Sequence, residues 1–120
     1  LAELSDRGIE IAVVTSNAEA NVRTILGPET SRHIRTFQCG AGLFSKRPKL
    51  RRALRRAGVR AHEALAIGDE VRDLDAAHAE GIPTGAVSWG YATPGRLRAR
   101  RPTVMFESVE DMRRLLLGDR

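Results

Sequence analysis

The chain has 120 residues and a net charge of +5, and 42% of the residues are hydrophobic but only 4% aromatic. This length suits one domain, so we expect a single domain over residues 1–120 with an aliphatic core. No apolar run approaches the roughly 18 residues of a membrane-spanning helix, so we expect no membrane contact. The single cysteine, Cys39, excludes an internal disulfide and is typical of a cytoplasmic protein.

Strands and helices are predicted to alternate along the chain. The predicted strands cover 9–14, 36–39, 64–67, 83–87 and 103–106, and the predicted helices cover 18–26, 47–57, 71–80 and 109–117. Residues 88–101 are predicted to be mostly loop. Gly27-Pro28 stops the first of these helices, Gly58 ends the second, and Ser108 opens the last with a capping box. Strands that alternate with helices of about ten residues predict an α/β fold with a parallel sheet.

The basic charge is spread along the chain, with runs at 51–56 and 96–101. A pI near 10.6 is compatible with nucleic-acid binding, but aromatic residues that could stack on bases are nearly absent. We therefore expect the basic residues to lie on solvated helix faces and to attract small anionic substrates. Nucleic-acid binding through the basic helix over 47–56 is kept as an alternative.

Lysine is rare in this chain. Of the 20 basic residues, only Lys46 and Lys49 are lysines, and all others are arginines. Lysine offers a compact point charge where arginine offers a planar fork. Either a site needs the ammonium group at these positions, or the two lysines stand there by chance.

Three polar clusters lie where an open α/β sheet binds ligands, beyond the carboxyl ends of its strands. Thr15-Ser16-Asn17 follows the first strand and opens a helix, so its hydroxyls and backbone amides could bind an anion, although such residues also serve as ordinary caps. Lys46 comes just before the basic helix and could neutralise a phosphate.

The third cluster is Gly68-Asp69-Glu70-Val71-Arg72-Asp73, directly after the apolar strand over 64–67. Asp69 and Asp73 stand four residues apart around a strand-to-helix turn. Hard carboxylate oxygens suit Mg²⁺, whereas acidic residues also favour a helix N-terminus through its dipole. The residues alone leave these two interpretations equal.

The three clusters in this order resemble the haloacid dehalogenase superfamily, over essentially the whole chain. "IAVVTSN" is similar to the second motif of that family, "LFSKRPKLRRALRR" to the third and "ALAIGDEVRDLDAA" to the fourth. The Gly-Asp-Glu-x-Arg-Asp form, with "VSWGY" downstream, looks most like the phosphoglycolate-phosphatase-like branch. The resemblance implies a three-layer, Rossmann-like parallel sheet with helices on both faces.

The resemblance also implies a role for each motif residue. Thr15 would donate its hydroxyl to the transferring phosphoryl group, beside the amide of Ser16 and the cap residue Asn17. Lys46 would balance charge on the phosphoryl group, and Lys49 is the less favoured candidate because the family lysine comes just before the helix. Asp69 and Asp73 would hold Mg²⁺ or support the lysine. These are the parts of a phosphatase that acts on a small phosphorylated metabolite through an aspartyl-phosphate.

One family motif has no counterpart here. The nucleophilic Asp-x-Asp tract at the end of an early strand is absent, and Asp73-Leu74-Asp75 lies inside a predicted helix instead. The chain also begins with Leu1 in what reads as the middle of a helix. We therefore expect a C-terminal part of the core that lacks the nucleophile strand and is inactive alone. The alternative is a non-catalytic binding or regulatory module.

The family places the nucleophile strand between the strand that ends before Thr15 and the strand over 64–67. Without it, two apolar strand edges face a gap, and such edges invite pairing with another chain. Either the natural protein contains this strand, or another segment or subunit fills its place, and in the latter case self-association through these edges is expected.

Overall fold

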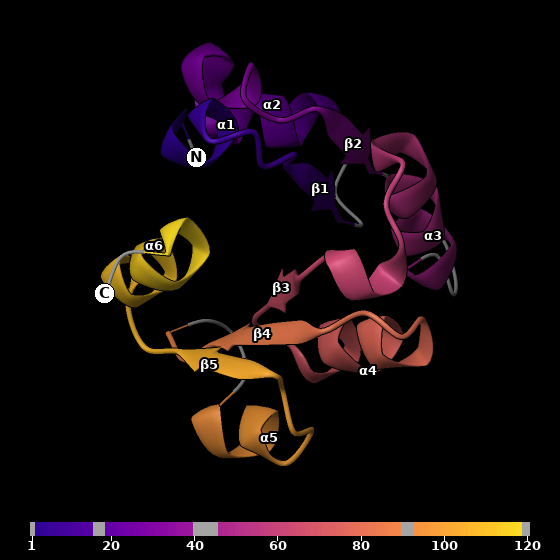
Figure 1. The fold of residues 1–120 in the computed structure, drawn as a ribbon, viewed down its shortest axis with the longest axis vertical. Helices are drawn as coiled ribbons and strands as arrows, with labels where there is room; N and C mark the ends of the chain where they lie inside the picture. The colour runs from indigo at the N-terminus through magenta and orange to yellow at the C-terminus, as the bar shows by residue number, and fades with distance from the viewer. Residues whose placement is uncertain (1, 16–18, 40–45, 90–92, 119–120) are drawn as a thin grey trace. The chain divides into compact units, whose positions relative to one another are not determined.

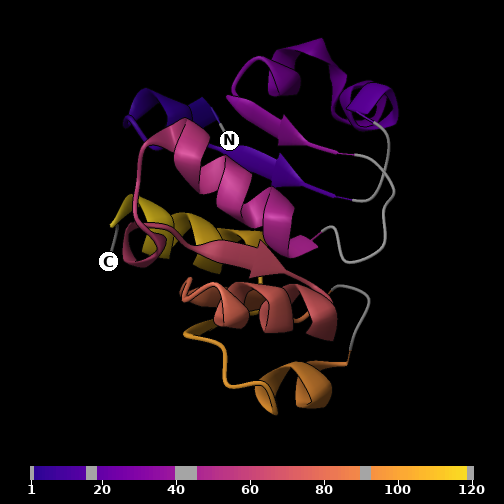
Figure 2. The same cartoon turned by 90° about the vertical axis from the view of Figure 1, so that its right-hand side faces the viewer.

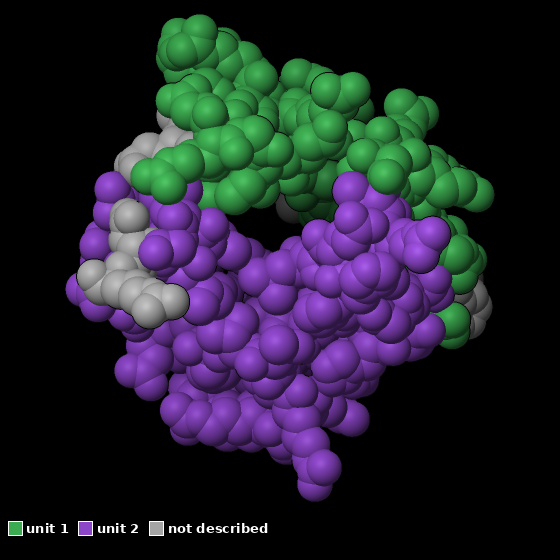
Figure 3. Space-filling model, viewed as in Figure 1, with its two compact units in different colours: residues 1–58 green, residues 59–120 purple. Residues whose placement is uncertain are grey.

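The computed structural model describes residues 2–15, 19–39, 46–89 and 93–118. The chain divides into two compact units, unit 1 (Leu1–Gly58) and unit 2 (Val59–Arg120), which Figure 3 shows in two colours. Both units combine parallel strands with helices (Figure 1), so the predicted α/β class is confirmed. Among the helices described, none has the length and apolar character that a membrane crossing requires. A single domain over residues 1–120 stays a prediction.

Unit 1 is built on two parallel strands. Its elements are α1 (Ala2–Asp6), β1 (Ala12–Val14), α2 (Glu19–Ser31), β2 (Thr36–Gln38) and α3 (Lys46–Ala57). Strands β1 and β2 run in the same direction (Figure 2), and their register pairs Ala12 with Thr36 and Val14 with Gln38. Their carboxyl ends therefore lie at the same edge, where Thr15 follows β1.

Helices α2 and α3 cover opposite faces of this strand pair. Arg23 of α2 lies 4.0 Å from the ring centre of Phe37 in β2. Arg52 of α3 donates a hydrogen bond of 3.1 Å to the side chain of the next strand residue, Gln38. Because neighbouring strand residues point to opposite faces, the two helices lie on different sides of β2. The expectation of helices on both faces is thus met in unit 1.

Two boundaries in unit 1 differ from the sequence-based prediction. Helix α2 does break at Gly27, whose φ of 81° and ψ of 163° are not helical, but a further helical turn continues to Ser31. Glycine adopts this positive φ without strain, and Pro28 suits the first turn of the helical segment that follows. Helix α3 starts at Lys46 rather than one residue later, so the lysine belongs to the first turn of the helix.

Unit 2 contains a three-stranded parallel sheet in the order β3-β4-β5. Its elements are the short 3₁₀ helix η1 (Ala61–Glu63), β3 (Ala66–Gly68), α4 (Val71–Ala79), β4 (Thr84–Val87), α5 (Pro94–Arg98), β5 (Val104–Phe106) and α6 (Val109–Leu117). The capping box predicted for α6 begins as expected, because Ser108 Oγ accepts a hydrogen bond of 3.0 Å from the amide of Asp111.

The apolar core of unit 2 lies between the sheet and helices α4 and α5. Leu74 of α4, Ala86 of β4 and Leu97 of α5 are almost fully buried together, and Met105 of β5 packs against them. Phe106, the next residue of β5, points to the other face of the sheet. Figure 1 shows α5 and α6 on opposite sides of β5, so the sheet of unit 2 also has helices on both faces.

In unit 2 one prediction is wrong and one helix was not predicted. The strand before Gly68 was expected to be buried, but Ile67 is 41% exposed because β3 has only one neighbouring strand in the described part of this sheet. The stretch over 88–101 was expected to be mostly loop, and the short helix α5 within it was not predicted. Its start signal is visible in the sequence, since Thr93 caps the helix and Pro94 takes its first position.

Candidate phosphate and metal sites

The carboxyl end of β1 is the first candidate site. Thr15 extends the ladder beyond β1, because its amide donates a hydrogen bond of 3.1 Å to the carbonyl of Gln38. Lys46, in the first turn of α3, places Nζ 3.4 Å from the carbonyl oxygen of Val14. The structure therefore brings the predicted residues Thr15 and Lys46 to the same strand end. The other two predicted phosphate ligands, Ser16 and Asn17, lie outside the described residues.

Lys49 is the lysine that the sequence favoured less than Lys46 for balancing the phosphoryl charge. Its side chain is the buried one of α3, at 7% exposure, and Nζ donates a hydrogen bond of 3.0 Å to the carbonyl of Thr15. The predicted apolar face of α3, which includes Leu50 and Leu54, is only half-buried. The signal that could have found Lys49 is the rarity of lysine in this arginine-rich chain.

Cys39 lies one residue beyond β2, at the same edge of the sheet. Burial raises the pKa of the Cys39 thiol, and the negative charge of Glu19 raises it further, while Lys49 and Arg23 act in the opposite direction. The thiol is therefore protonated near neutral pH, and a protonated thiol is a poor nucleophile. Cys39 does not have the electrostatics of a catalytic cysteine.

The carboxyl end of β3 is the second candidate site. Asp69 and Glu70 connect β3 to α4, and Asp73 lies in the first turn of α4. Asp73 Oδ2 accepts a hydrogen bond of 3.3 Å from the amide of Glu70, which holds the carboxylate toward the strand end. Glu70 itself pairs with Arg72 at 2.6 Å.

Gly68 lets the Asp73 carboxylate come close to the backbone of β3. A Cβ atom at position 68 would lie 2.5 Å from Cβ of Asp73 and 2.8 Å from its Oδ2, which is too close for any side chain. The glycine before Asp69 is therefore required by its close packing against Asp73. It places the Asp73 carboxylate directly over the end of β3.

The donor set at this strand end fits Mg²⁺ in part. The described residues include no cluster of three or more His, Cys, Asp or Glu side chains arranged to hold a metal. Mg²⁺ is nevertheless usually bound through one or two carboxylates, with waters and phosphate oxygens completing its shell. Asp69 and Asp73 are the two carboxylate residues that would hold Mg²⁺ in this mode.

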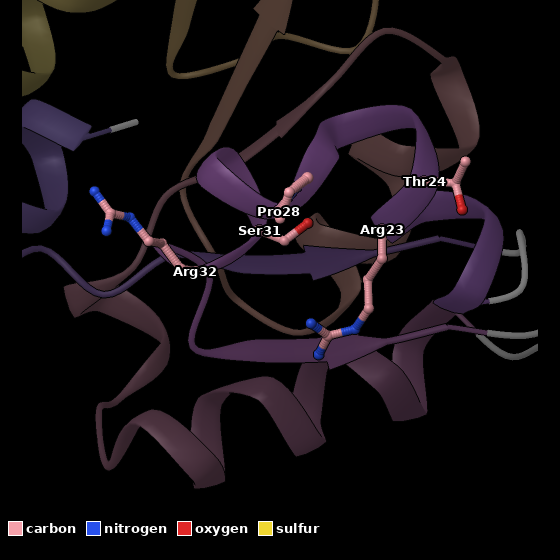
Figure 4. A pocket seen from close by; sticks show the side chains of 5 residues that line it. All are labelled: Arg23, Thr24, Pro28, Ser31 and Arg32. Carbon is pink, nitrogen blue, oxygen red and sulfur yellow. The ribbon is translucent and has the colours of Figure 1, made fainter.

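A pocket of about 490 Å³ lies elsewhere in unit 1, along α2 (Figure 4). It is lined by Arg23, Thr24, Pro28, Ser31 and Arg32. The two guanidinium groups do not converge, and each arginine pairs with a glutamate of its own helix, Glu19 at 2.8 Å and Glu29 at 3.2 Å. The pocket therefore has little net charge to attract an anion, and it contains none of the predicted site residues.

The fold is that of a Rossmann-like α/β protein, with a lysine at the carboxyl end of β1 and carboxylate residues after β3. A family model for haloacid dehalogenase-like hydrolase matches residues 1–87. The chain therefore belongs to the haloacid dehalogenase-like hydrolase family.

Two relatives and two solved structures illustrate the relationship. The chain is 30% identical over 113 residues to the phosphoglycolate phosphatase of Synechococcus elongatus, covering 93% of this chain and 53% of the relative. It is 34% identical over 115 residues to the phosphoglycolate phosphatase of Mesorhizobium japonicum, covering 92% and 50%. The chain thus spans about half the length of these relatives.

The solved structures show the fold. A haloacid dehalogenase-like family hydrolase from Streptococcus pneumoniae superposes with a TM-score of 0.81 at 18% identity, covering 98% of this chain and 55% of that one. A predicted phosphoglycolate phosphatase from Haemophilus somnus gives 0.83 at 21% identity, covering 95% and 52%. Because both identities are low, these structures support the three-layer α/β architecture and nothing finer.

Proposed function

We propose that this chain carries the phosphate-binding and metal-binding residues of a Mg²⁺-dependent phosphatase that acts on a small phosphorylated metabolite. The observation that carries the proposal is the placement of Lys46 Nζ at the carbonyl of Val14, beside Thr15 at the carboxyl end of β1. Asp69 follows β3 directly, and the Asp73 carboxylate accepts a hydrogen bond from the amide of Glu70 at this strand end. Ligands of open α/β sheets bind at such ends.

Each group of residues has a part in the proposed chemistry. The Thr15 hydroxyl donates a hydrogen bond to a phosphoryl oxygen, and the Lys46 ammonium balances the charge that the phosphoryl group carries during transfer. Asp69 and Asp73 would hold Mg²⁺, which would supply stabilisation of negative charge on a phosphoryl group. The transfer passes through an aspartyl-phosphate, and its nucleophile is not among residues 1–120.

The choice of candidate substrates rests on the names of the two relatives. Both relatives are named for phosphoglycolate, so 2-phosphoglycolate and other small phosphorylated acids are the first substrates to try. The excess of positive charge, +5, favours the approach of such anions.

The test uses the protein as its gene encodes it, with p-nitrophenyl phosphate as the generic substrate. We expect hydrolysis that requires Mg²⁺ and falls by about 100-fold or more in Asp69→Asn, the scale typical for a group that stabilises transition-state charge. Asp75→Asn is the matched control, since Asp75 lies on α4 but pairs with Arg100 at 3.7 Å.

Three outcomes separate the possibilities. Loss of phosphate hydrolysis in Asp69→Asn, with normal hydrolysis in Asp75→Asn, supports the proposal. Robust activity in Asp69→Asn removes Asp69 from the metal site. A natural protein with no phosphatase activity, but with specific binding of small phosphorylated ligands, would support the non-catalytic binding module instead.

A further inference from the structure

Lys49 is a buried cation in a helix that is otherwise strongly basic and solvated. It is 7% exposed, while the neighbouring Arg51 and Arg52 are exposed. Taking an ammonium group out of water is costly unless hydrogen bonds and charge compensate for it. A leucine at this position would avoid that cost if packing were its only role.

Three basic residues of α3 reach the carboxyl ends of β1 and β2 from one face of the helix. Lys46, Lys49 and Arg52 follow each other at intervals of three residues, which places them on one side of a helix. Lys46 bonds to the carbonyl of Val14 at 3.4 Å, Lys49 to that of Thr15 at 3.0 Å, and Arg52 to the side chain of Gln38 at 3.1 Å. Lys49 is the member that bonds to Thr15 itself.

The peptide groups of Thr15 are therefore fixed on both sides. Its amide donates to the carbonyl of Gln38 at 3.1 Å, and its carbonyl accepts from Lys49 at 3.0 Å. Thr15 lies one residue beyond β1, so the ladder to β2 holds its amide and Lys49 holds its carbonyl. The bond from Lys49 therefore helps to fix the backbone from which the Thr15 hydroxyl projects.

We propose that Lys49 is a positioning residue, whose ammonium group holds the Thr15 carbonyl so that the Thr15 hydroxyl is oriented toward a bound phosphoryl group. The inference rests on the proposed function, because it assumes that Thr15 binds phosphate. It adds a second lysine, with a role distinct from that of Lys46. Lys46 acts on the phosphoryl charge, and Lys49 acts through the backbone of Thr15.

The test compares Lys49→Met and Lys49→Gln in the full-length protein. Methionine and glutamine are both one bond shorter than lysine and match each other in length. Methionine keeps an apolar stem but cannot donate a hydrogen bond, whereas glutamine keeps a donor without the charge. A misplacement of about 1 Å in a catalytic group can reduce the rate by about 100-fold. We therefore expect Lys49→Met to lower kcat by about tenfold to 100-fold, with KM changed less than about threefold.

Lys49→Gln should recover most of the kcat lost in Lys49→Met, because its amide donates to the same carbonyl. Arg52→Met is the matched control, since it removes a cation and one hydrogen bond from the same face of α3 without touching Thr15. Its kcat should stay within about threefold of the natural protein, even where its melting temperature falls as far as that of Lys49→Met.

Several results would overturn the inference. These are an unchanged kcat in folded Lys49→Met, an equal loss in Arg52→Met, or a Lys49→Gln variant as impaired as Lys49→Met. The last result would mean that the charge matters and the hydrogen bond does not. Failure of the proposed function is recognised separately, because the natural protein would then show no Mg²⁺-dependent hydrolysis in any comparison.

Discussion

The two units bury different kinds of residue. Among the described residues of unit 1 the buried apolar side chains are Val22 and Ile34, while the buried polar ones are Ser31, Thr36, Gln38 and Lys49. Unit 2 buries Leu74, Ala76, Ala77, Ile82, Ala86, Val87, Leu97, Phe106 and Leu117, and in its described part Thr84 is the buried polar residue. Unit 2 therefore has the core of an ordinary small domain, and unit 1 does not.

The two kinds of buried residue serve different purposes, positioning of side chains in unit 1 and stability in unit 2. Buried polar groups add little stability but define positions, because each must keep its hydrogen-bond partners. In unit 1, Gln38 and Lys49 lie at the strand ends where Thr15 and Lys46 are expected to bind phosphate, whereas Thr36 begins β2 and Ser31 ends α2. In unit 2 the apolar core supports a single acidic turn, and Thr84 is satisfied there by the amide of Thr103 at 3.3 Å.

The largest expected effect tests this contrast directly. Leu74→Ala leaves a cavity at a residue that is 1% exposed, so it should lower the free energy of unfolding by about 2–5 kcal/mol. Val22→Ala in unit 1 should cost about 1–2 kcal/mol, because it removes fewer buried carbon atoms. Urea denaturation of the full-length variants measures both. Equal losses would show that unit 1 depends on its apolar contacts as much as unit 2 does.

Gly68→Ala should separate packing from chemistry at the acidic turn. The new Cβ would displace the Asp73 carboxylate, so we expect the free energy of unfolding to fall by about 1–3 kcal/mol. We also expect weaker Mg²⁺ binding, so that half-maximal activity requires a higher Mg²⁺ concentration. Gly95→Ala in α5 is the control, since its Cβ would meet no atom within 4 Å. Activity measured over a range of Mg²⁺ concentrations decides the matter, and an unchanged profile in Gly68→Ala would argue against Asp73 as a metal-site residue.

Ser31→Ala tests whether every buried polar group of unit 1 is needed. Within the described chain, Ser31 Oγ is buried with no hydrogen-bond partner. Removing a buried hydroxyl without a partner should leave stability unchanged or raise it by about 1 kcal/mol. Thermal unfolding of the variant measures this. A clear decrease would mean that the hydroxyl has a partner such as bound water.

The smallest expected effect is on the reactivity of the Cys39 thiol, which depends on the charges at the strand end in unit 1. Because its pKa is raised, less thiolate is present near neutral pH, so iodoacetamide should react more slowly than with free cysteine. The rate should rise with pH and reach its midpoint above the ordinary thiol pKa. A midpoint below that value would show that Lys49 and Arg23 outweigh burial and Glu19.

Much of the fold could be predicted because its signals are local. Gly8, Gly58, Gly81 and Gly118 all adopt positive φ at helix ends, and the Ser108 cap lies where its spacing indicates. The same local signal was missed at Thr93-Pro94, where a helix of five residues, α5, carries too few apolar residues to show a periodic pattern.

The site was predicted less completely, and for a different reason. Thr15, Lys46, Asp69 and Asp73 stand at strand ends that sequence order alone reveals. The burial of Lys49 and the exposure of Ile67 depend on which elements pack together, and no local pattern encodes this. Lys49 in particular lies among arginines on a basic helix, where a solvated position is the natural expectation.

The most direct test of the account is the inhibition of hydrolysis by inorganic phosphate in the full-length protein and in Lys46→Met. The account predicts that phosphate competes with the substrate, and that Lys46→Met weakens this competition by about tenfold or more, the equivalent of about 1.4 kcal/mol of phosphate binding. Arg47→Met, next to Lys46 but exposed, should leave it unchanged. Equal inhibition in Lys46→Met and the natural protein would contradict a phosphate site at the end of β1.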